Sequence, residues 1–574
     1  MQNVSKLKYG DPKNWDISVG DWIDDLAIRF KENPAIVCHM HSSHGGGTVR
    51  WSFPELVHQV HTMQHLFARL GITKGDRVAV LLANSPEWLV SFLALMRMGA
   101  VMVPINPRYG STEIAAVLAK SKSCCLISMA TFLGRDYSFS IADAISIHKP
   151  GVENVTNPFL RDIISTYGQV HPHAKDMQTL KNDAANQLII HGAPALVDDP
   201  SLAAIMLFTS GTTSGPKAVQ LTHRNILRHS LNCIDLMELE PKDVAASLLP
   251  FHGVSGGINK PLSTLGAGAC IVFQESFNAT EAAKILTQES CTVIYALDVQ
   301  IREIISALQI ETISNNVTSV RRRGTITFMT GQDDTLVESM RNALGIERFI
   351  NGYGTTEVNS LVLRNSLNHC TLDSLLPGGL PAPDMQVRVV QPGTSNDVQD
   401  GELGEIIVRG PATSIAYVDD VQATSSAYRD SWFHTGDLGE RRSDGFITLK
   451  ARMGDILKVG GYKITPQEVE QFLRRHPSVA DVAVTSMQDD RLGEVPVALV
   501  VAKIGTEALQ KFDATMKAWC KGKIANFKTP RHFWIVEKLP YQVGGNGQKL
   551  LRKELPQLAV ALYSASISHH IIPN

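Results

Sequence analysis

The sequence predicts an α/β protein. We expect a large N-terminal domain, made of two doubly wound α/β halves and a small β-rich subdomain, followed by a small, mobile α+β C-terminal domain. The 574 residues exceed the size of one ordinary domain. Apolar strand-like segments alternate with amphipathic helix-like segments in two long stretches, which is typical of parallel sheets covered by helices. From Asp384, short β-like segments bounded by Gly, Pro or Asp replace this alternation.

The first stretch is expected to form strand, helix, strand, helix and strand in that order. Its segments are DRVAVLLANS (76–85), PEWLVSFLALMRMG (86–99), AVMVPINPR (100–108), STEIAAVLAKSKS (111–123) and CCLISMA (124–130). The pattern recurs in DVAASLLP (243–250), ACIVFQE (269–275), TEAAKILTQES (280–290), TVIYAL (292–297) and TITFMTG (325–331). The sequence therefore predicts two related α/β halves, although the two stretches share no detectable repeat.

The remaining segments define the predicted domain boundaries. MQVRVVQPG, GEIIVRG and DGFITLKAR indicate the β-rich subdomain at residues 384–453, within a large domain of residues 1–453. The small domain at 454–574 is expected to contain the helices PQEVEQFLRRHP and KFDATMKAWCKGKI and the strands DVAVTSMQD, EVPVALVVA and FWIVEKL. We place the hinge between the two domains at residues 452–456.

Composition narrows the classes of protein that this chain can be. The formal charge of −2 and the scattered Lys and Arg residues predict no nucleic-acid partner. The most apolar segment, residues 91–105, is interrupted by Arg97, so we expect no integral membrane segment. Eight cysteines without CxxC spacing indicate reduced thiols and a cytoplasmic protein. The histidine-rich CHMHSSH (38–44) matches no standard zinc spacing and predicts a loop between two strands.

Residues 209–223, TSGTTSGPKAVQLTH, are the first candidate for a ligand site. A Walker loop is excluded, because it needs a hydroxyl residue after its lysine and Lys217 precedes Ala218. Glycines, hydroxyl side chains and one lysine can nevertheless form an anion-binding nest. A loop of this composition is also typical of a flexible connection. The strand-like IMLF before it favours the phosphate loop.

This loop and six further motifs resemble, in order, those of the adenylate-forming (ANL) superfamily, and within it the AMP-forming acyl-CoA synthetases. The six are LLPFHGVSG (248–256), GYGTTE (352–357), GELGEIIVRG (401–410), FHTGDLG (433–439), ARMGDILKVGGYKITPQEVE (451–470) and NGQKLLRKEL (546–555). The resemblance spans nearly the whole chain. It implies that a carboxylic acid reacts with ATP to give an acyl-adenylate and pyrophosphate, and that the thiol of CoA then displaces AMP.

The resemblance also implies ATP, Mg²⁺ and CoA as cofactors, and nucleotide-binding residues in several of the motifs. Those expected at the β- and γ-phosphates are Thr209, Ser210, Gly211, Thr212, Thr213, Ser214, Gly215 and Lys217. Thr356 would contact the α-phosphate, and Glu357 would bind Mg²⁺. In the same motif Tyr353 would stack on adenine, next to Gly354 and Thr355. Asp437 and Arg452 would bind the ribose.

The remaining implied roles concern the acid, CoA and the conformational change. Lys549 would orient the reacting carboxylate and the α-phosphate oxygens. His252 would lie at the mouth of the acyl pocket. Asp455 would be the pivot of the small domain. The residues implied along the CoA path are Lys458, Gly460 and Gly461.

Two alternatives stay open, one with a different thiol acceptor and one prompted by departures from the family pattern. Gln548 stands where the family has glycine, Gly454 stands where many members have lysine, and TGQDDT (330–335) stands where many have GGAPL. One alternative is an acyl-AMP ligase that loads the phosphopantetheine thiol of a carrier protein, and the other is a nucleotide-binding pseudoenzyme. The segments expected to line the acid pocket, 252–257, 329–332 and 352–359, contain no arginine or lysine, which favours a monocarboxylic aliphatic or aryl acid.

Overall fold

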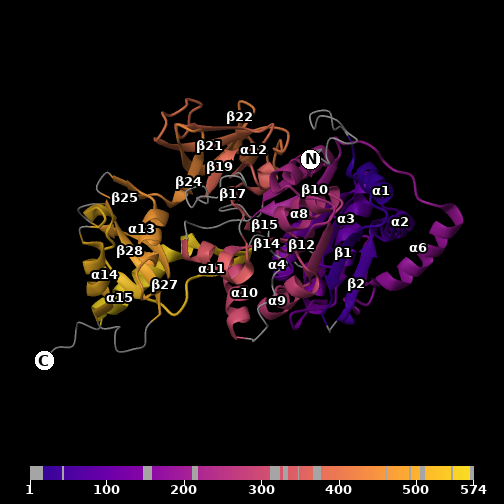
Figure 1. The fold of residues 1–574 in the computed structure, drawn as a ribbon, viewed down its shortest axis with the longest axis horizontal. Helices are drawn as coiled ribbons and strands as arrows, with labels where there is room; N and C mark the ends of the chain where they lie inside the picture. Colours follow the sequence, from indigo (N-terminus) through magenta and orange to yellow (C-terminus); the bar gives the residue numbers. More distant parts are fainter. Residues whose placement is uncertain are drawn as a thin grey trace. The chain divides into compact units, whose positions relative to one another are not determined.

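The computed structural model describes residues 17–41, 44–146, 158–209, 217–310, 323–326, 334–346, 348–365, 377–459, 462–489, 493–503, 511–521, 523–544 and 547–568. The chain divides into two compact units, which are described separately (Figure 1). Unit 1 comprises Met1–Val387, Val408–Phe433 and Gly545–Gly547, and unit 2 comprises Arg388–Ile407, His434–Gly544 and Gln548–Asn574.

The first predicted α/β half forms a seven-stranded sheet in unit 1, with the order β11-β10-β4-β3-β5-β8-β9. Its strands are β3 (Arg77–Leu81), β4 (Val101–Pro104), β5 (Cys125–Met129), β8 (Asp162–Thr166), β9 (Lys175–Asp176), β10 (Ala203–Thr209) and β11 (Lys217–Thr222). Strands β4, β3, β5, β8 and β9 are parallel, while β10 and β11 form an antiparallel pair. The intervening elements are α3 (Pro86–Met98), α4 (Ser111–Ser121), β6 (Thr131–Phe132), β7 (Arg135–Asp136), α5 (Ser138–Ser146) and α6 (Met177–His191).

Local sequence signals fix the ends of helix α3. Ser85 accepts a hydrogen bond from the backbone N–H of Trp88, and Pro86 occupies the first turn. Gly99 ends the helix at φ 66°, in the left-handed conformation. Arg97 is buried inside this apolar helix, where its guanidinium donates to Gln64 Oε1 at 2.8 Å and pairs with Asp24. The cation that interrupts the most apolar segment therefore has internal partners.

The second predicted half forms another seven-stranded sheet in unit 1, with the order β16-β15-β14-β12-β13-β1-β2. Its strands are β1 (Pro34–His39), β2 (Thr48–Ser52), β12 (Val244–Ser247), β13 (Cys270–Gln274), β14 (Val293–Ala296), β15 (Arg323–Ile326) and β16 (Phe349–Ile350). All neighbours are parallel except β1 and β2. The associated helices are α1 (Val19–Arg29), α2 (Phe53–Arg69), α7 (His223–Met237), the π-helix η4 (Val254–Asn259), α8 (Lys260–Gly266), α9 (Ala279–Gln288), α10 (Asp298–Ile310) and α11 (Asp334–Leu344).

Strand β1 shows one difference from the order of segments in the sequence. It precedes the first sheet in the chain but pairs with β13 of the second sheet, with Ile36 opposite Ile271. The predicted loop is borne out in part: Cys38 and His39 end β1, whereas Met40, His41 and His44 lie between β1 and β2. Among the described residues, no group of His, Cys, Asp or Glu side chains is placed to hold a metal ion. None of the helices that the structure describes combines the length and apolar character needed to span a membrane.

Short antiparallel elements follow the second sheet. In unit 1, β17 (Gly352–Tyr353) pairs with β18 (Leu363–Arg364), which pairs with β19 (Gly378–Pro381). The other elements here are η5 (Thr356–Val358), α12 (Val421–Ala427) and β22 (Tyr428–Arg429). Strands β20 (Gln386–Val390), β21 (Leu403–Arg409) and β23 (Trp432–Arg441) contribute residues to both units, and β24 (Ile447–Arg452) belongs to unit 2. The predicted short β segments are all strands.

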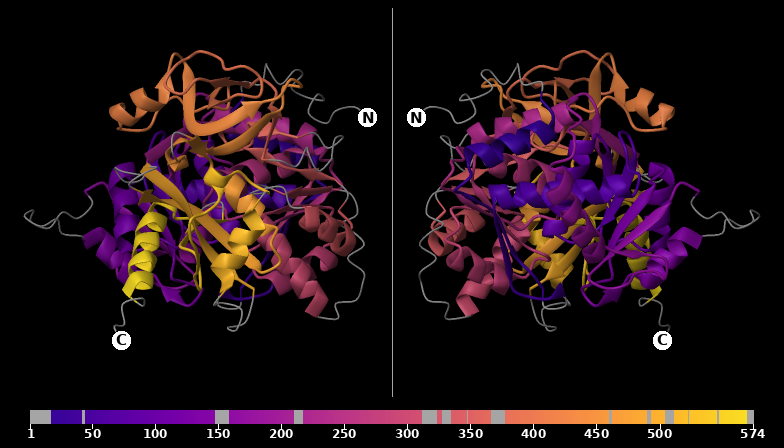
Figure 2. Two further views of the ribbon diagram at one scale, coloured as in Figure 1. Left: turned by 90° about the vertical axis from the view of Figure 1, so that its left-hand side faces the viewer. Right: turned by 90° about the vertical axis from the view of Figure 1, so that its right-hand side faces the viewer.

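Unit 2 also contains a five-stranded sheet with its own apolar core. The strand order is β26-β25-β28-β27, and β29 pairs with β28. Helices α13 and α15 pack against β27, and α15 is the yellow helix in Figure 2. The elements are η7 (Met453–Asp455), β25 (Leu457–Val459), β26 (Tyr462–Ile464), α13 (Pro466–Arg474), β27 (Val479–Asp489), β28 (Gly493–Ala502), α14 (Phe512–Cys520), η9 (Asn526–Lys528), β29 (Phe533–Ile535), β30 (Tyr541–Gly544), β31 (Gly547–Leu550), η10 (Arg552–Glu554) and α15 (Leu555–Ser568).

The predicted fold class is confirmed. Two largely parallel sheets with helical connections, short β elements and a small α+β part all occur in the predicted order. Fully buried Val, Ile, Leu and aromatic side chains form separate clusters in unit 1 and in unit 2.

Candidate active site

The predicted phosphate loop connects the two strands of the β10–β11 pair. Thr209 and Lys217 lie opposite each other in register at the end of this pair. The intervening loop residues, Ser210–Pro216, lie outside the described residues. The Nζ atom of Lys217 lies 4.7 Å from the centre of the Tyr417 ring, which places the ammonium group over an aromatic face.

The GYGTTE motif folds as the short strand β17 followed by the 3-10 turn η5. Glu357 is buried, and its Oε1 accepts a hydrogen bond from Tyr417 Oη at 2.8 Å. The backbone carbonyl of Glu357 accepts from Ser414 N–H at 2.8 Å. Glycine is required at position 354, because a Cβ there would lie 1.3 Å from the carbonyl oxygen of Ser360. The backbone at Ser360, shortly after Glu357, therefore passes very close to the backbone at Gly354.

Tyr417 connects the two candidate groups that the sequence placed in separate motifs. Its ring faces Lys217 and its hydroxyl group bonds Glu357. The structure thus brings together the lysine of the phosphate loop and the predicted magnesium ligand. Sequence reasoning missed Tyr417, which lies in the unremarkable segment SIAYVDD. Its only sequence signal is its position shortly after the GELGEIIVRG motif.

The other predicted residues of GYGTTE lie at or next to this turn. Tyr353 is buried in β17, and Thr355 is the residue that precedes η5. Within the described part of the chain, the buried Oγ1 atom of Thr355 has no hydrogen-bond partner. An unpaired hydroxyl beside a buried carboxylate fits a phosphate group and its hard cation, because both need polar ligands.

Asp437 and Arg452 face each other across the antiparallel strands β23 and β24 of unit 2. Arg452 Nε lies 2.7 Å from Asp437 Oδ1. Asp437 is buried, whereas the Arg452 side chain is largely exposed. Both predicted ribose ligands are therefore held in one ion pair, with carboxylate oxygens that can accept hydrogen bonds from hydroxyl groups.

His252 lies in the turn that leads into η4. Asn84 holds this turn, because its side chain donates to Leu249 O at 3.0 Å and accepts from Phe251 N–H at 2.8 Å. Within the described residues, the buried Nε2 atom of His252 has no hydrogen-bond partner. Burial, together with the positive charge of Arg108, lowers the pKa of His252 to about 4. The imidazole is therefore neutral at physiological pH.

The predicted residues of the hinge and lysine segments are only partly described. Gly460 and Gly461 lie outside the described residues. Lys458 is in β25 and Lys549 is in β31, but their side chains also lie outside the described part. Of the TGQDDT segment, Thr330–Asp333 lie outside it, and Asp334 begins α11.

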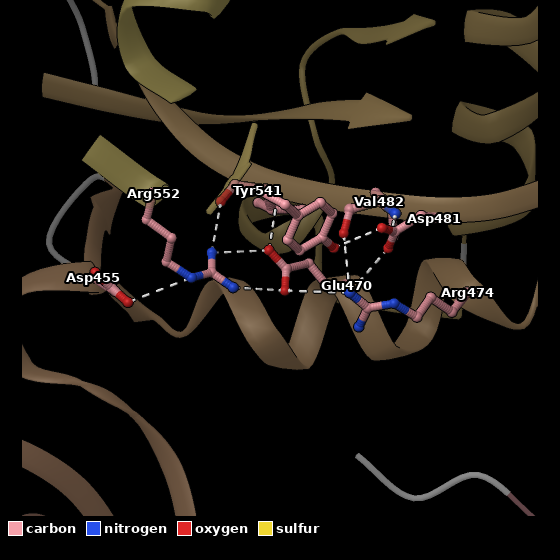
Figure 3. A network of polar contacts seen from close by, with 8 residues as sticks. Asp455, Glu470, Arg474, Asp481, Val482, Tyr541 and Arg552 are labelled. Atoms are coloured by element: carbon pink, nitrogen blue, oxygen red, sulfur yellow. Dashed lines mark hydrogen bonds and ion pairs between the residues drawn. The ribbon is translucent and has the colours of Figure 1, made fainter. Parts of the chain in front are cut away.

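A network of charges in unit 2 connects the predicted pivot to the segment that follows β31 (Figure 3). Arg552 donates to both carboxylate oxygens of Glu470, at 2.9 and 2.8 Å, and its Nε lies 3.4 Å from Asp455 Oδ2. Glu470 is buried and also accepts from Val484 N–H at 2.8 Å. These contacts fix Arg552 between helix α13 and turn η7.

Two family models match the chain. The model of the AMP-binding enzyme matches residues 24–418, and that of the AMP-binding enzyme C-terminal domain matches residues 468–545. The chain belongs to the AMP-binding enzyme family. The predicted membership of the adenylate-forming superfamily is therefore confirmed. The chain is an AMP-forming acid–thiol ligase, and its reaction is the activation of an acid as the acyl-adenylate before thioester formation, as predicted.

Several members of the family resemble this protein over most of its length. A 3-[(3aS,4S,7aS)-7a-methyl-1,5-dioxo-octahydro-1H-inden-4-yl]propanoyl:CoA ligase of Rhodococcus jostii (strain RHA1) is 30% identical over 88% of this chain and 94% of its own. A crotonobetaine/carnitine–CoA ligase of Escherichia coli is 29% identical over 93% of this chain and 97% of its own. ATP-bound MatB of Rhodopseudomonas palustris shares the fold, with a TM-score of 0.78 and 22% identity over 95% of this chain and all of the MatB chain.

Proposed function

We propose that this AMP-binding enzyme uses CoA as its thiol and forms an acyl-CoA, AMP and pyrophosphate from a carboxylic acid and ATP. The observation that supports it best is the linkage of Lys217 and Glu357 through Tyr417 at the end of the predicted phosphate loop. CoA is also the acceptor named for the two relatives of known activity.

The described residues suggest how ATP and Mg²⁺ would be bound. The loop from Thr209 to Lys217 would hold the β- and γ-phosphates, and Thr356 would contact the α-phosphate. Glu357 would bind Mg²⁺, whose charge would neutralise the phosphate oxygens. Asp437 and Arg452 would bind the ribose. The buried Glu357 carboxylate is oriented by Tyr417, which would keep it in place before the nucleotide enters.

The assignments in the hinge and lysine segments remain part of the proposal. Lys549 would orient the acid carboxylate during adenylate formation, and Lys458, Gly460 and Gly461 would border the CoA path. The proposed domain boundary is at 453/454, with Asp455 as the pivot. Rotation of the small domain about this pivot would let its residues serve the two half-reactions in succession. We also propose a cytoplasmic location, which the seven free, buried cysteines of the described part support.

The test is a reaction of the purified protein with ATP, Mg²⁺, CoA and a panel of carboxylic acids. We expect equal amounts of AMP, pyrophosphate and thioester with at least one acid. A panel without any AMP formation would refute the proposal and favour a nucleotide-binding pseudoenzyme. Replacement of CoA by a phosphopantetheinylated carrier protein in the same assay separates the carrier-loading alternative.

Lys549→Ala tests the proposed role of the lysine. We expect adenylate formation to fall by at least about 100-fold, since one preorganised charge is removed from the transition state. Thioester formation from a supplied acyl-adenylate should be largely retained. An equal loss in both half-reactions would show that Lys549 does not have this role.

A further inference from the structure

Lys260 is a buried cation in the core of unit 1. It is the first residue of α8, and its side chain is fully inaccessible to solvent. Its Nζ lies 3.7 Å from Met237 Sδ and 5.1 Å from the centre of the Tyr295 ring. Among the described residues, no carboxylate lies within ion-pair distance of Lys260. Burial lowers its pKa to about 8, so the ammonium form still predominates at neutral pH.

Further buried polar groups lie on helix α7 or on segments beside it, since α7 packs against η4 and α8 and Asn359 bonds its first turn. We define the polar cluster as His229, Asn259, Lys260, Ser360 and Arg364. Within the described part of the chain, the cluster includes these buried atoms without a hydrogen-bond partner: His229 Nε2, Asn259 Nδ2, Asn259 Oδ1, Ser360 Oγ and Arg364 Nη1. Buried polar atoms are normally paired, so this concentration is unusual.

The field in the polar cluster is positive. Burial, together with the positive charges of Arg364 and Lys260, lowers the pKa of His229 to about 3. His229 is therefore neutral, and two cations remain. The acidic neighbours that face them are few: Asp235 acts on Arg364, and the thiol of Cys233 acts on both cations. For Lys260 no carboxylate partner occurs among the described residues, and a buried positive charge without a compensating anion is costly, which favours an anionic ligand.

The polar cluster begins beside the proposed magnesium ligand and extends away from it. Ser360 follows Glu357 closely in the chain, and the neighbouring Asn359 donates to the carbonyl of Asn225 in the first turn of α7 at 3.2 Å. Lys260, in contrast, contacts Met237, the last residue of α7. At 1.5 Å per residue, these two helix positions are about 18 Å apart. The unpaired ammonium therefore lies toward the end of α7 that is far from Glu357.

We propose that the polar cluster binds the acid substrate, and that this acid has a second carboxylate, which pairs with Lys260 and Arg364. The inference rests on the proposed ligase function and specifies its substrate class. It differs from the monocarboxylic acid expected from the sequence, because Lys260 and Arg364 lie just outside the segments expected to line the pocket and are brought beside α7 only by the fold. His229, Asn259 and Ser360 would supply neutral hydrogen bonds along the length of the acid.

The first experiment compares acids that differ only in the second carboxylate. Succinate, glutarate, adipate and suberate are each tested beside the monomethyl ester and the straight-chain monocarboxylic acid of equal length. Pyrophosphate release gives kcat/KM with ATP, Mg²⁺ and CoA present. We expect at least one dicarboxylate to exceed its ester by on the order of 10- to 100-fold, the range for a hydrogen bond to a charged group. A preference for esters throughout would overturn the inference.

Lys260→Met tests the residue itself, because methionine keeps most of the length and removes the charge. We expect kcat/KM for the preferred dicarboxylate to fall about 10- to 100-fold, mainly through KM, with little change for the monocarboxylic acid. Lys242→Met, at an exposed lysine, is the matched control and should change neither. Thermal stabilisation by ATP shows whether Lys260→Met is folded. If Lys260→Met does not fold, Lys260→Gln is used in its place.

Three other outcomes separate this inference from the proposed function. If no acid supports AMP formation in the wild-type protein, the proposed function itself fails. If Lys260→Met lowers kcat/KM equally for every acid and raises KM for ATP, the cluster holds nucleotide phosphate and the inference is wrong. If adipate and its monomethyl ester bind the wild-type protein with equal affinity in calorimetry, the cluster is filled by water, and the inference is again wrong.

Discussion

The hydroxyl group and the ring of Tyr417 contact two charged neighbours at once. The hydroxyl donates to Glu357 Oε1, while the ring faces the ammonium group of Lys217. A hydrogen bond to a metal-binding carboxylate fixes its orientation, and loss of such a partner commonly lowers metal affinity by about 10- to 100-fold. Tyr417 is therefore a positioning residue in the proposed reaction.

Tyr417→Phe should raise the Mg²⁺ concentration that gives half-maximal activity by about 10-fold, because the ring contact is kept and only the hydroxyl is lost. Tyr428→Phe is the matched control. Its hydroxyl lies nearby but bonds Ser414 Oγ at 2.5 Å, not the carboxylate. Titration of Mg²⁺ in a pyrophosphate-release assay measures the effect. Equal shifts in both variants would refute the role assigned to Tyr417.

His44 is the second residue with a testable electrostatic role. Its Nδ1 lies 2.8 Å from Glu275 Oε1, its Nε2 lies 3.0 Å from Thr131 O, and its ring stacks on Tyr167. Burial alone would lower the pKa of His44, but the hydrogen bond and charge of Glu275 outweigh burial and raise it above 6.5. A raised pKa in the folded state means that protonated His44 stabilises the fold.

The stabilisation by His44 is fully present below its unfolded pKa of 6.5 and is lost as pH rises through the raised folded pKa. The difference in Tm between wild type and His44→Gln should therefore be largest below that value and should shrink at alkaline pH. His58→Gln, at an exposed histidine, serves as the control and should give a difference that varies less with pH. A difference for His44→Gln that grows with pH would contradict this interpretation.

Helix α13 and turn η7 are joined by the Arg552 network of unit 2 (Figure 3). Glu470 is only 2% exposed, so its pairing with Arg552 takes place away from solvent. Removing one member of a buried ion pair leaves the other charge uncompensated. The network should therefore matter for the stability of this unit even though charges of this kind contribute little at a surface.

Glu470→Gln should lower the free energy of unfolding of unit 2 by about 3 kcal/mol, because the Arg552 guanidinium loses its bidentate, buried anion and keeps only the more distant Asp455. Denaturant unfolding followed by the fluorescence of Trp519 and Trp534, both within unit 2, measures the change. The control is Glu537→Gln, at an exposed glutamate. A change below about 0.5 kcal/mol, typical of surface substitutions, would show that the network adds no stability.

At the scale of elements, the sequence predicted helices and strands that follow from local residue patterns. It did not predict contacts between segments that are distant in the chain. Alternating apolar segments such as 76–85 and 86–99 correctly predicted β3 and α3. The pairing of β1 with β13 could not be read from any local pattern, since it joins Ile36 to Ile271. The π-helix η4 was also missed. It depends on the close approach of Gly257 to Phe251, where a Cβ would lie 1.8 Å from the carbonyl oxygen.

The candidate site shows the same limit. Family motifs predicted Glu357, Asp437 and Arg452 as site residues, and the ion pair that joins the last two is a finding of the structure. Tyr417 and Lys260 were not predicted, because neither belongs to a motif and each gains its significance from neighbours distant in the chain.

At the scale of the whole molecule, the two units have separate apolar cores. Leu93 is fully buried in the main cluster of unit 1, and Leu473 is fully buried in the cluster of unit 2. Separate cores allow separate unfolding, as expected for a chain of several domains. The stabilities of the two units should therefore respond to different substitutions.

Leu473→Ala should destabilise unit 2 by about 2 to 5 kcal/mol through the cavity that it leaves. Hydrogen–deuterium exchange should then increase in α13, β27 and β28 but stay unchanged in β3, β4 and β5. Leu93→Ala is the reciprocal variant and should give the opposite pattern. An increase throughout the chain in either variant would show that the protein unfolds as one cooperative unit.

The close approach of the chain to itself at Gly354 limits which substitutions can change the acid specificity of this enzyme. The Ser360 carbonyl occupies the space of a Cβ at Gly354, so the segment between them closes on itself around Glu357. A substitution that moves Ser360 to fit a new acid must also move the carboxylate proposed to hold the metal. Divergence toward other acids is therefore expected to proceed through substitutions on helices α7 and α8, which leave this closed segment intact.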